Sequence, residues 1–238
     1  MPEEKKELQR EEKLSGAVRM KSPFLAKLEN FWYHYKWPFL IGIFALVVLI
    51  VCLVQCTGNG RGDDAYMMYA GGKPLTPNGY REVENSMQPF LEDRNGDGKL
   101  ILAMQSYAIY TEKEIRELSA DAQAHAAELT YNNQKAFEQD LEGTLCFLAE
   151  WIYEKEAKAD GLVPLSELME TLPEGVEVIS VDGVAYGVRL SSLPIYALPG
   201  FSEMREDTVL CMRRRPLYAE EKLYEANTRL FSRLVNAQ

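Results

Sequence analysis

The sequence predicts a single apolar membrane helix followed by an α/β domain, and two features carry this prediction. The run from Phe39 to Val54 contains no charged side chain. After it, through residues 64–238, short apolar segments typical of strands alternate with segments whose apolar residues recur at helical spacing. This alternation is typical of an α/β fold with a mainly parallel sheet and, in this chain, a mixed second part.

The apolar run is long enough to cross a bilayer. With Pro38 and Gln55 it approaches the ~17–25 residues that a helix needs to span ~30 Å of hydrocarbon. The segment before it, FWYHYKW at residues 31–37, supplies aromatic residues that favour the headgroup layer. We expect one interfacial and transmembrane helix over residues 23–56, with a kink at Pro38 and with lipid contact through residues 37–55.

Three other interpretations of the run fit less well. A core helix of a soluble domain rarely stays uncharged on all sides for more than four turns. A cleaved signal peptide has a shorter n-region, an apolar core of ~7–15 residues and a small-x-small cleavage site, which residues 54–57 do not offer. A lipoprotein signal would require a small residue before Cys56, where the chain has Gln55.

The charges on either side of the run predict its orientation. Eight Lys and Arg residues precede it, whereas only Arg61 follows before Asp63 and Asp64. Because Lys and Arg are retained on the cytoplasmic side, we expect residues 1–22 to be a charged cytoplasmic tail and the protein to be a single-pass protein of the cell membrane. The C-terminal domain is then extracellular. From residue 57 onward it carries 18 Lys and Arg against 30 Asp and Glu, which argues against nucleic acid as a partner.

Residues 57–63 are expected to form a linker, and residues 64–238 one extracytoplasmic α/β domain. Its predicted strands are residues 64–70, 99–110, 145–151, 176–181, 185–190 and 208–214. Its predicted helices begin at Pro77, at a capping box formed by Thr111 and Glu114, at Asn132 after a break near residue 130, and at Pro216. The last of them has an apolar face formed by Leu223, Ala226, Leu230, Leu234 and Val235.

Several short phrases make this domain resemble a known family. They are KAFEQDLEG at residues 135–143, CFLAEW at 146–151, LVPLSEL at 162–168, AYGVRLSSLPIY at 185–196 and TVLCMRR at 208–214. They look like extracellular solute-binding proteins of the type 2 periplasmic-binding fold. The whole chain also resembles a group of uncharacterised single-pass membrane proteins of clostridia-like Gram-positive bacteria. The resemblance implies a reduced periplasmic-binding-like mixed sheet with flanking helices, because a full binding protein is far longer.

One loop matches the first half of an EF-hand-type calcium site. The candidate metal ligands are Asp93, Asn95, Asp97 and Lys99, at positions 1, 3, 5 and 7 of that pattern. Gly98 permits the sharp turn, but position 12 is Met104, where such loops place a bidentate Glu. A tight helix-to-strand turn has the same composition. We keep both interpretations, a structural calcium site and a plain turn, and expect no other cofactor.

The domain contains two of the four cysteines, Cys146 and Cys211, and both lie in predicted core strands. The sequence therefore predicts two buried free thiols. A disulfide is the alternative outside the cytosol, if their Cα atoms lie within ~7 Å of each other.

Residues for covalent catalysis are scarce. His34 lies in the aromatic segment and His125 in a charged helical segment, so a Ser–His or Cys–His pair could be built only around His125. Gly71, Gly72 and Lys73 follow the first predicted strand, as a simple turn or, in a solute-binding protein, as the border of the ligand cleft. The basic cluster Arg213, Arg214 and Arg215 is either a solvated strand end or a contact with an anionic surface.

Together these features favour a membrane-anchored extracytoplasmic protein that works by binding or assembly and is not an enzyme. The alternative is a solute-binding receptor for a small ligand or peptide, stabilised by calcium. The partner in either case is a protein or a small ligand whose identity the sequence does not give.

Overall fold

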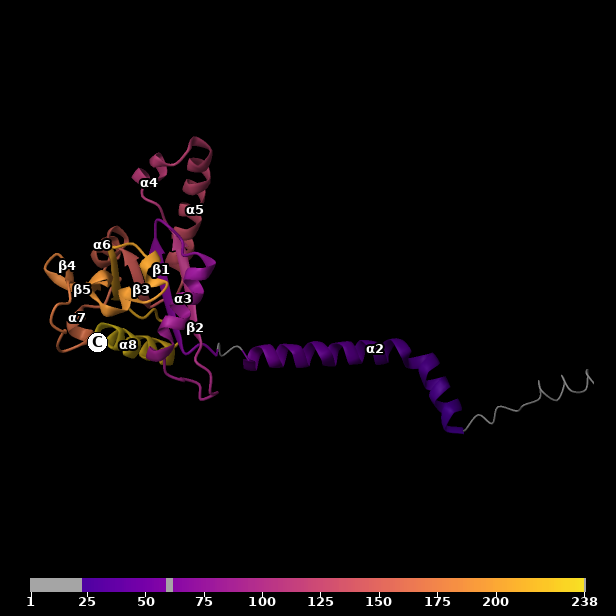
Figure 1. Cartoon of the computed structure of the whole chain (residues 1–238). Coiled ribbons are helices and arrows are strands. Elements are labelled where there is room, and N and C mark those ends of the chain that lie inside the picture. The colour runs from indigo at the N-terminus through magenta and orange to yellow at the C-terminus, as the bar shows by residue number, and fades with distance from the viewer. Residues whose placement is uncertain (1–22, 59–61, 238) are drawn as a thin grey trace, which may run out of the picture. The chain divides into compact units, whose positions relative to one another are not determined.

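A computed structural model of the chain describes residues 23–58 and 62–237 (Figure 1). The predicted cytoplasmic tail, residues 1–22, and residues 59–61 of the predicted linker lie outside the described residues. The chain divides into two compact units, Met1–Arg61 and Gly62–Gln238. The division falls within the predicted linker, residues 57–63.

The first unit contains helix α2, Pro23–Gly58. Its segment Tyr35–Cys52 has a mean hydropathy of 2.2 and is not buried, and α2 is the one helix among the described residues that is long and apolar enough to cross a membrane. Figure 1 shows a bend in α2. Pro38 lies inside the helix, where a proline removes one backbone hydrogen bond and crowds the preceding turn. The helix ends at Gly58, so it includes the start of the predicted linker.

The second unit is built on one six-stranded sheet with the order β2-β1-β3-β6-β5-β4. The strands are β1 Ala65–Gly71, β2 Leu102–Ala108, β3 Leu145–Ala149, β4 Val178–Val181, β5 Val184–Arg189 and β6 Thr208–Met212. Strand β1 pairs in parallel with β2 and β3. Strand β6 runs antiparallel to β3 and to β5, and β5 runs antiparallel to β4. A mixed sheet with flanking helices confirms the predicted α/β class. The prediction of a mainly parallel sheet is wrong, because β6, β5 and β4 make only antiparallel pairs.

Helices cover both faces of this sheet. The helices of this unit are α3 Pro77–Met87, α4 Glu112–Glu117, α5 Ala120–Gln139, α6 Glu150–Lys158, α7 Leu165–Leu168 and α8 Glu221–Val235, with the 3-10 helices η1 Gln88–Phe90, η2 Leu190–Ser192, η3 Pro194–Ala197 and η4 Phe201–Glu203. Residues of α3 and α8 belong to the buried cluster on one face, and residues of α5 and α6 to the cluster on the other. Strands β1 and β3 are consequently buried along their whole length.

One buried polar side chain ties α8 to the two central strands. Asn227 is fully buried; its side-chain oxygen accepts from the Tyr66 backbone N–H on β1 at 3.0 Å, and its amide donates to Thr144 Oγ1 at 2.8 Å. Thr144 immediately precedes β3. The predicted apolar face of this helix is buried around Asn227, which confirms that prediction.

Three predicted boundaries lie more than two residues from their observed positions. The helical break lies at Leu118 and Ser119, which have extended backbone angles, and α5 continues through residue 130 because Thr130 Oγ1 accepts from the Tyr110 N–H at 3.1 Å. Helix α8 begins at Glu221 because residues 216–219 form a turn, closed by a 3.0 Å bond from Ala219 N–H to Pro216 O. Strand β2 is shorter than predicted because residues before Leu102 belong to a loop.

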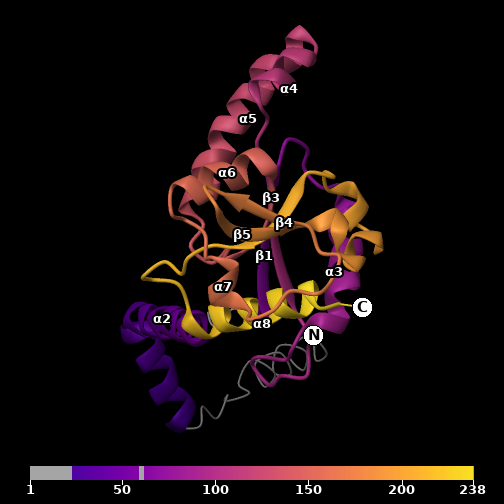
Figure 2. The same ribbon diagram turned by 90° about the vertical axis from the view of Figure 1, so that its left-hand side faces the viewer.

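Helix α4 and the first part of α5 project from the rest of the domain in both views (Figure 1, Figure 2). We call residues 111–129 the arm. The predicted capping box begins it: the Glu114 N–H donates to Thr111 Oγ1, and the Glu114 carboxylate accepts from the Thr111 N–H. The second half of α5 instead packs on β2, where Asn133 donates to the Ala108 carbonyl at 2.9 Å. The arm thus extends beyond the sheet from a base that is firmly packed.

Replacing Asn227 with alanine tests the buried link. Asn227→Ala leaves the Tyr66 N–H and the Thr144 hydroxyl without their buried partner, so we expect a loss of about 2 kcal/mol in the free energy of unfolding. Urea unfolding followed by circular dichroism measures it. Asn132→Ala, at an exposed position of α5, is the control and should change stability little. Equal effects of the two substitutions would contradict the role given to Asn227.

Candidate ligand-binding site

The carboxyl ends of β1 and β3 form the edge of the sheet where an α/β protein most often holds a ligand. Such sites lie where neighbouring parallel strands continue to opposite faces of the sheet. Here β1 leads to α3 on one face, and β2 leads through α5, on the other face, to β3. Because β6 is antiparallel to β3, its first residue and the last residues of β5 lie at the same edge. We call this the carboxyl edge.

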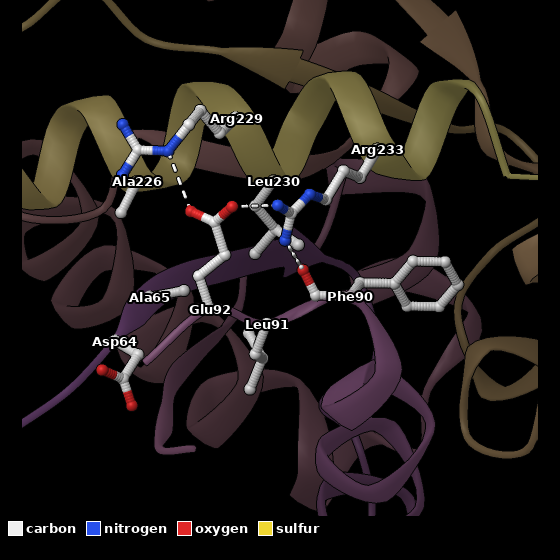
Figure 3. Close-up of a pocket in the computed structure, with 9 residues that line it drawn as sticks. All are labelled: Asp64, Ala65, Phe90, Leu91, Glu92, Ala226, Arg229, Leu230 and Arg233. Atoms are coloured by element: carbon white, nitrogen blue, oxygen red, sulfur yellow. Dashed lines mark hydrogen bonds and ion pairs between the residues drawn. The ribbon is translucent and has the colours of Figure 1, made fainter. Parts of the chain in front are cut away.

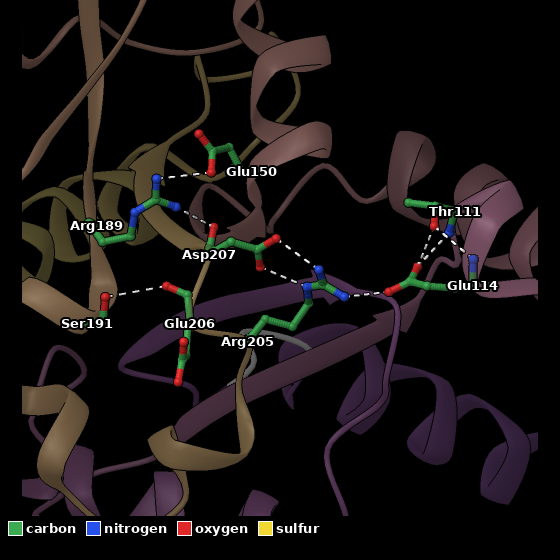
Figure 4. Close-up of polar contacts among 8 residues, drawn as sticks. All are labelled: Thr111, Glu114, Glu150, Arg189, Ser191, Arg205, Glu206 and Asp207. Atoms are coloured by element: carbon green, nitrogen blue, oxygen red, sulfur yellow. Dashed lines mark hydrogen bonds and ion pairs between the residues drawn. The ribbon is translucent and has the colours of Figure 1, made fainter. Parts of the chain in front are cut away.

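Arg205, which lies between η4 and β6, connects the arm to the sheet at this edge (Figure 4). Its guanidinium donates to both carboxylate oxygens of Asp207, at 2.7 and 2.9 Å, and to Oε1 of Glu114 on α4. The other oxygen of Glu114 accepts from the Thr111 N–H at 2.7 Å and from the Thr111 hydroxyl at 2.9 Å. The side chains of Arg205 and Glu114 are 35% and 26% exposed, so solutes can reach the pair.

A second arginine extends the network toward β5 (Figure 4). Arg189 donates to Glu150 Oε2 at 3.0 Å and to the Asp207 backbone carbonyl at 2.8 Å. It also pairs with Glu177 at 3.4 Å, and its side chain is only 12% exposed. The two arginines therefore hold four carboxylates, with Asp207 between them.

Two acids of the carboxyl edge, Asp207 and Glu203, have lowered pKa values. The hydrogen bond from Arg205 lowers the pKa of Asp207. Glu203 on η4 accepts from the Thr76 N–H at 3.0 Å, which is the main cause of its lowered pKa, and from the Thr76 hydroxyl at 2.8 Å. Asp207 in turn raises the pKa of Arg205. Groups with such pKa values keep their charge near neutral pH, which suits recognition of charge better than proton transfer.

Two buried hydroxyl groups of this edge have no hydrogen-bond partner among the described residues. They are Tyr69 Oη on β1 and Thr208 Oγ1 at the start of β6, and both residues are fully buried. Burial raises the pKa of Tyr69, and the nearby Arg205 backbone opposes that shift without completing a hydrogen bond. An unpaired buried hydroxyl lowers the stability of the folded state by about 1–3 kcal/mol. A ligand whose polar atoms reached these two hydroxyls would form the missing hydrogen bonds.

The predicted ligand-cleft residues Gly71, Gly72 and Lys73 lie at this edge, directly after β1. A Cβ on Gly71 would come within 2.8 Å of Tyr69 Oη and 3.5 Å of Arg205 Cδ. A Cβ on Gly72 would come within 2.6 Å of the Glu114 carboxylate. The two glycines therefore make room for the network, while Lys73 is exposed and its charge contributes to the lowered pKa of Glu203.

The candidate calcium loop uses its oxygen atoms to hold its own backbone. Asp93 Oδ1 accepts from the Gly96 N–H at 2.6 Å, and its Oδ2 accepts from the Gly98 N–H at 2.8 Å. Asn95 and Asp97 each accept from the N–H two residues ahead, at 2.9 and 2.8 Å. In the part of the chain that the structure describes, no group of three His, Cys, Asp or Glu side chains could hold a metal. Calcium binding by this loop and Lys99 stays a prediction.

Cys146 and Cys211 are direct neighbours across the antiparallel pair of β3 and β6. Both are buried and free, and burial raises the pKa of Cys211. Two buried thiols agree with the first of the two expectations. Direct partners of an antiparallel pair lie within the Cα separation that a disulfide needs, so the disulfide also stays a prediction.

The basic cluster is largely engaged within the domain. The Arg213 side chain is 16% exposed, pairs with Glu156 at 3.7 Å and lies 4.8 Å from the centre of the Phe137 ring. Arg214 pairs with Asp160 at 3.1 Å, and Arg215 pairs with Glu221 at 3.7 Å. Arg213 therefore has a structural role, and contact with an anionic surface stays a prediction for the more exposed Arg214 and Arg215.

A shallow pocket lies at the opposite edge of the sheet, near the start of β1 (Figure 3). Its lining residues are Asp64, Ala65, Phe90, Leu91, Glu92, Ala226, Arg229, Leu230 and Arg233. Glu92 accepts from Arg229 at 2.9 Å and from Arg233, and the bond from Arg229 is the main cause of its lowered pKa. Arg233 also donates to the Phe90 carbonyl at 2.9 Å. The charged side chains of this pocket pair with one another, and none of its lining residues has an unpaired buried hydroxyl. The carboxyl edge is therefore the better candidate for a ligand-binding site.

The carboxyl edge predicts how stability changes with pH. Because the folded-state pKa of Asp207 is lowered, its contribution to stability is complete above the unfolded-state value of ~3.9 and is lost as the pH falls through the folded-state pKa. We expect Asp207→Asn to be less stable than the wild type at pH ~7, and the difference to shrink at pH ~3. Urea unfolding at both pH values measures this. A difference that grows on acidification would contradict the assignment.

Sequence patterns did not single out Arg189, Arg205 or Asp207. Strand pairing brings Arg189 next to Asp207, and Asp207 lies two residues from Arg205, but the three residues form no recognisable motif. Within this network only the capping box of the arm is a recognisable motif. Comparison of the chain with known protein families, curated proteins and solved structures gives no match. The resemblance to type 2 solute-binding proteins therefore stays a prediction, and the fold is stated as a mixed α/β domain preceded by an apolar helix.

Proposed function

We propose that the protein is a membrane-anchored extracytoplasmic receptor that works by binding, without covalent chemistry. The observation that carries the proposal is the junction of Arg205 with Glu114 and Asp207. It is a partly exposed guanidinium at the switch point of the sheet, beside buried hydroxyls that lack partners. Helix α2 supports the anchor by its length and apolar composition, and the excess of Lys and Arg before it supports a cytoplasmic N-terminus.

The chemistry of the junction suggests the ligand class. Glu114 offers Arg205 one carboxylate oxygen from an arm that extends beyond the sheet. A carboxylate of a ligand, such as an amino acid or the C-terminus of a peptide, can take the place of Glu114 and bind Arg205 through two oxygens. The hydroxyls of Tyr69 and Thr208 are fully buried, so pairing with the ligand's remaining polar atoms would also require this edge to open.

Thermal unfolding of the full chain in detergent tests this proposal. The panel consists of amino acids and short peptides, each compared with its neutral C-terminal amide. A ligand at ~100 times its dissociation constant stabilises the folded state by about 2.7 kcal/mol, which raises the midpoint by several degrees. We expect at least one carboxylate ligand to raise the midpoint of the wild type and its amide to raise it less.

Two variants localise the effect. Arg205→Gln should lose the ligand-induced shift, whereas Arg81→Gln, an exposed arginine of α3 that bonds to Asn78, should keep it. A shift that survives in Arg205→Gln would place the ligand elsewhere. A panel that leaves the wild-type midpoint unchanged throughout would contradict the receptor proposal.

A second candidate is assembly with a protein partner through the arm. The observation that favours it is the projection of α4 and the first part of α5 from the domain, with Ala126 as the buried residue of this part of α5. A photo-reactive residue at the exposed position 124 should form one specific adduct in membranes of the producing cell, and the same residue at Lys158 on α6 should not. Equal adducts from both positions, or none, would contradict assembly through the arm.

A further inference from the structure

The connection between β6 and α8 carries the two most exposed large apolar side chains of the described residues. Leu217 is 93% exposed and Tyr218 is 89% exposed. They are the two central residues of the turn closed by the Ala219 N–H and the Pro216 carbonyl at 3.0 Å. In the rest of the domain the next most exposed large apolar side chain, Tyr131, is 59% exposed. We call residues 214–219 the apolar turn.

Ion pairs hold the base of the apolar turn while its tip stays in solvent. Arg214 pairs with Asp160 at 3.1 Å, and Arg215 pairs with Glu221 at 3.7 Å. The Arg214 backbone N–H also donates to the Gly161 carbonyl at 2.8 Å. The position of the tip is therefore fixed by the domain, although Leu217 and Tyr218 gain little burial from it.

The apolar turn lies next to the point where the domain joins the anchor helix along the chain. Glu220, which follows the turn, pairs with Arg94. The guanidinium of Arg94 also donates to the Asp63 backbone carbonyl, at 2.9 and 3.1 Å. Gly58, the last residue of α2, precedes Gly62 by four residues, which span at most about 14 Å. If α2 crosses a bilayer, the chain keeps this edge of the domain within reach of the lipid surface.

We propose that Leu217 and Tyr218 insert into the headgroup layer of the bilayer and dock the domain on the membrane. This inference rests on the proposed membrane anchor and is independent of the ligand site. Leucine supplies apolar area, and tyrosine favours the interface because its ring is apolar and its hydroxyl is polar. The arginines at the base already pair with acids. Further acids lie at this edge of the sheet: Glu92 lines the pocket with Asp64, and the Asp97 carboxylate lies close to Gly62. Insertion therefore depends on apolar contact, and zwitterionic lipid suffices.

Depth-dependent quenching on the full chain tests the contact. The protein, with Cys52 and Cys56 changed to serine, is labelled through single cysteines with an environment-sensitive dye and placed in phosphatidylcholine nanodiscs that carry nitroxide lipids. Leu217→Cys reports on the turn, Phe44→Cys on the anchor and Lys113→Cys on the arm, where the side chain is 86% exposed. We expect strong quenching at positions 44 and 217 and little at 113.

The three labels test the membrane anchor and the docking of the apolar turn separately. A label at position 44 that is not quenched would overturn the anchor itself. Quenching at 44 without more quenching at 217 than at 113 would overturn the docking proposal alone. If instead the 217 label is shielded in lipid-free amphipol, more strongly as the protein concentration rises, the turn contacts a second copy of the chain, which also overturns docking on lipid.

Hydrogen exchange on the unlabelled protein gives an independent readout. Leu217→Ser combined with Tyr218→Ser removes the apolar tip and, because both side chains are exposed, should leave the fold intact. In nanodiscs we expect the amides of residues 217–220 to exchange faster in this variant than in the wild type, and at equal rates in amphipol. The same exchange rates for both proteins in nanodiscs would contradict insertion.

Discussion

Complete burial of the central strands β1 and β3 is the constraint on which the rest of the domain depends. Every residue of both strands is buried, so each face of the sheet must be covered by apolar side chains from helices. Helices α3 and α8 meet this need on one face, and α5 and α6 on the other. The polar groups that remain inside must then find partners, as Asn227 does by bonding to Tyr66 and Thr144.

Covering both faces leaves the two ends of the strands for polar chemistry. At the carboxyl edge, Arg189 and Arg205 form ion pairs with acidic residues of α4, α6 and the segment before β6. At the opposite edge, Arg94 and Glu220 bring the start of the domain next to the turn that carries Leu217 and Tyr218. Recognition of a ligand and contact with the membrane are therefore proposed for opposite edges of one sheet, so that one need not interfere with the other.

The sequence predicted those parts of the fold that depend on local patterns. The apolar run from Phe39 to Val54, the capping box at Thr111 and the apolar face of α8 each depend on spacing within one element, and the structure contains all three. The break in the arm was misplaced because the contact of Thr130 with Tyr110 is tertiary. Arg205 could not be recognised because Glu114 is 91 residues away along the chain and meets it only in the assembled fold, while Asp207, two residues from Arg205, does not by itself mark a site.

One guanidinium, that of Arg205, joins the arm to the carboxyl edge through its bond to Glu114. The most direct test is the distance between nitroxide labels at Lys113→Cys on the arm and Arg81→Cys on α3, measured by double electron–electron resonance on the full chain with Cys52 and Cys56 changed to serine. We expect one narrow distribution of distances in the otherwise unchanged protein. It should broaden in Arg205→Gln and stay narrow in Arg116→Gln, which removes an ion pair within α4. An unchanged distribution in Arg205→Gln would contradict it.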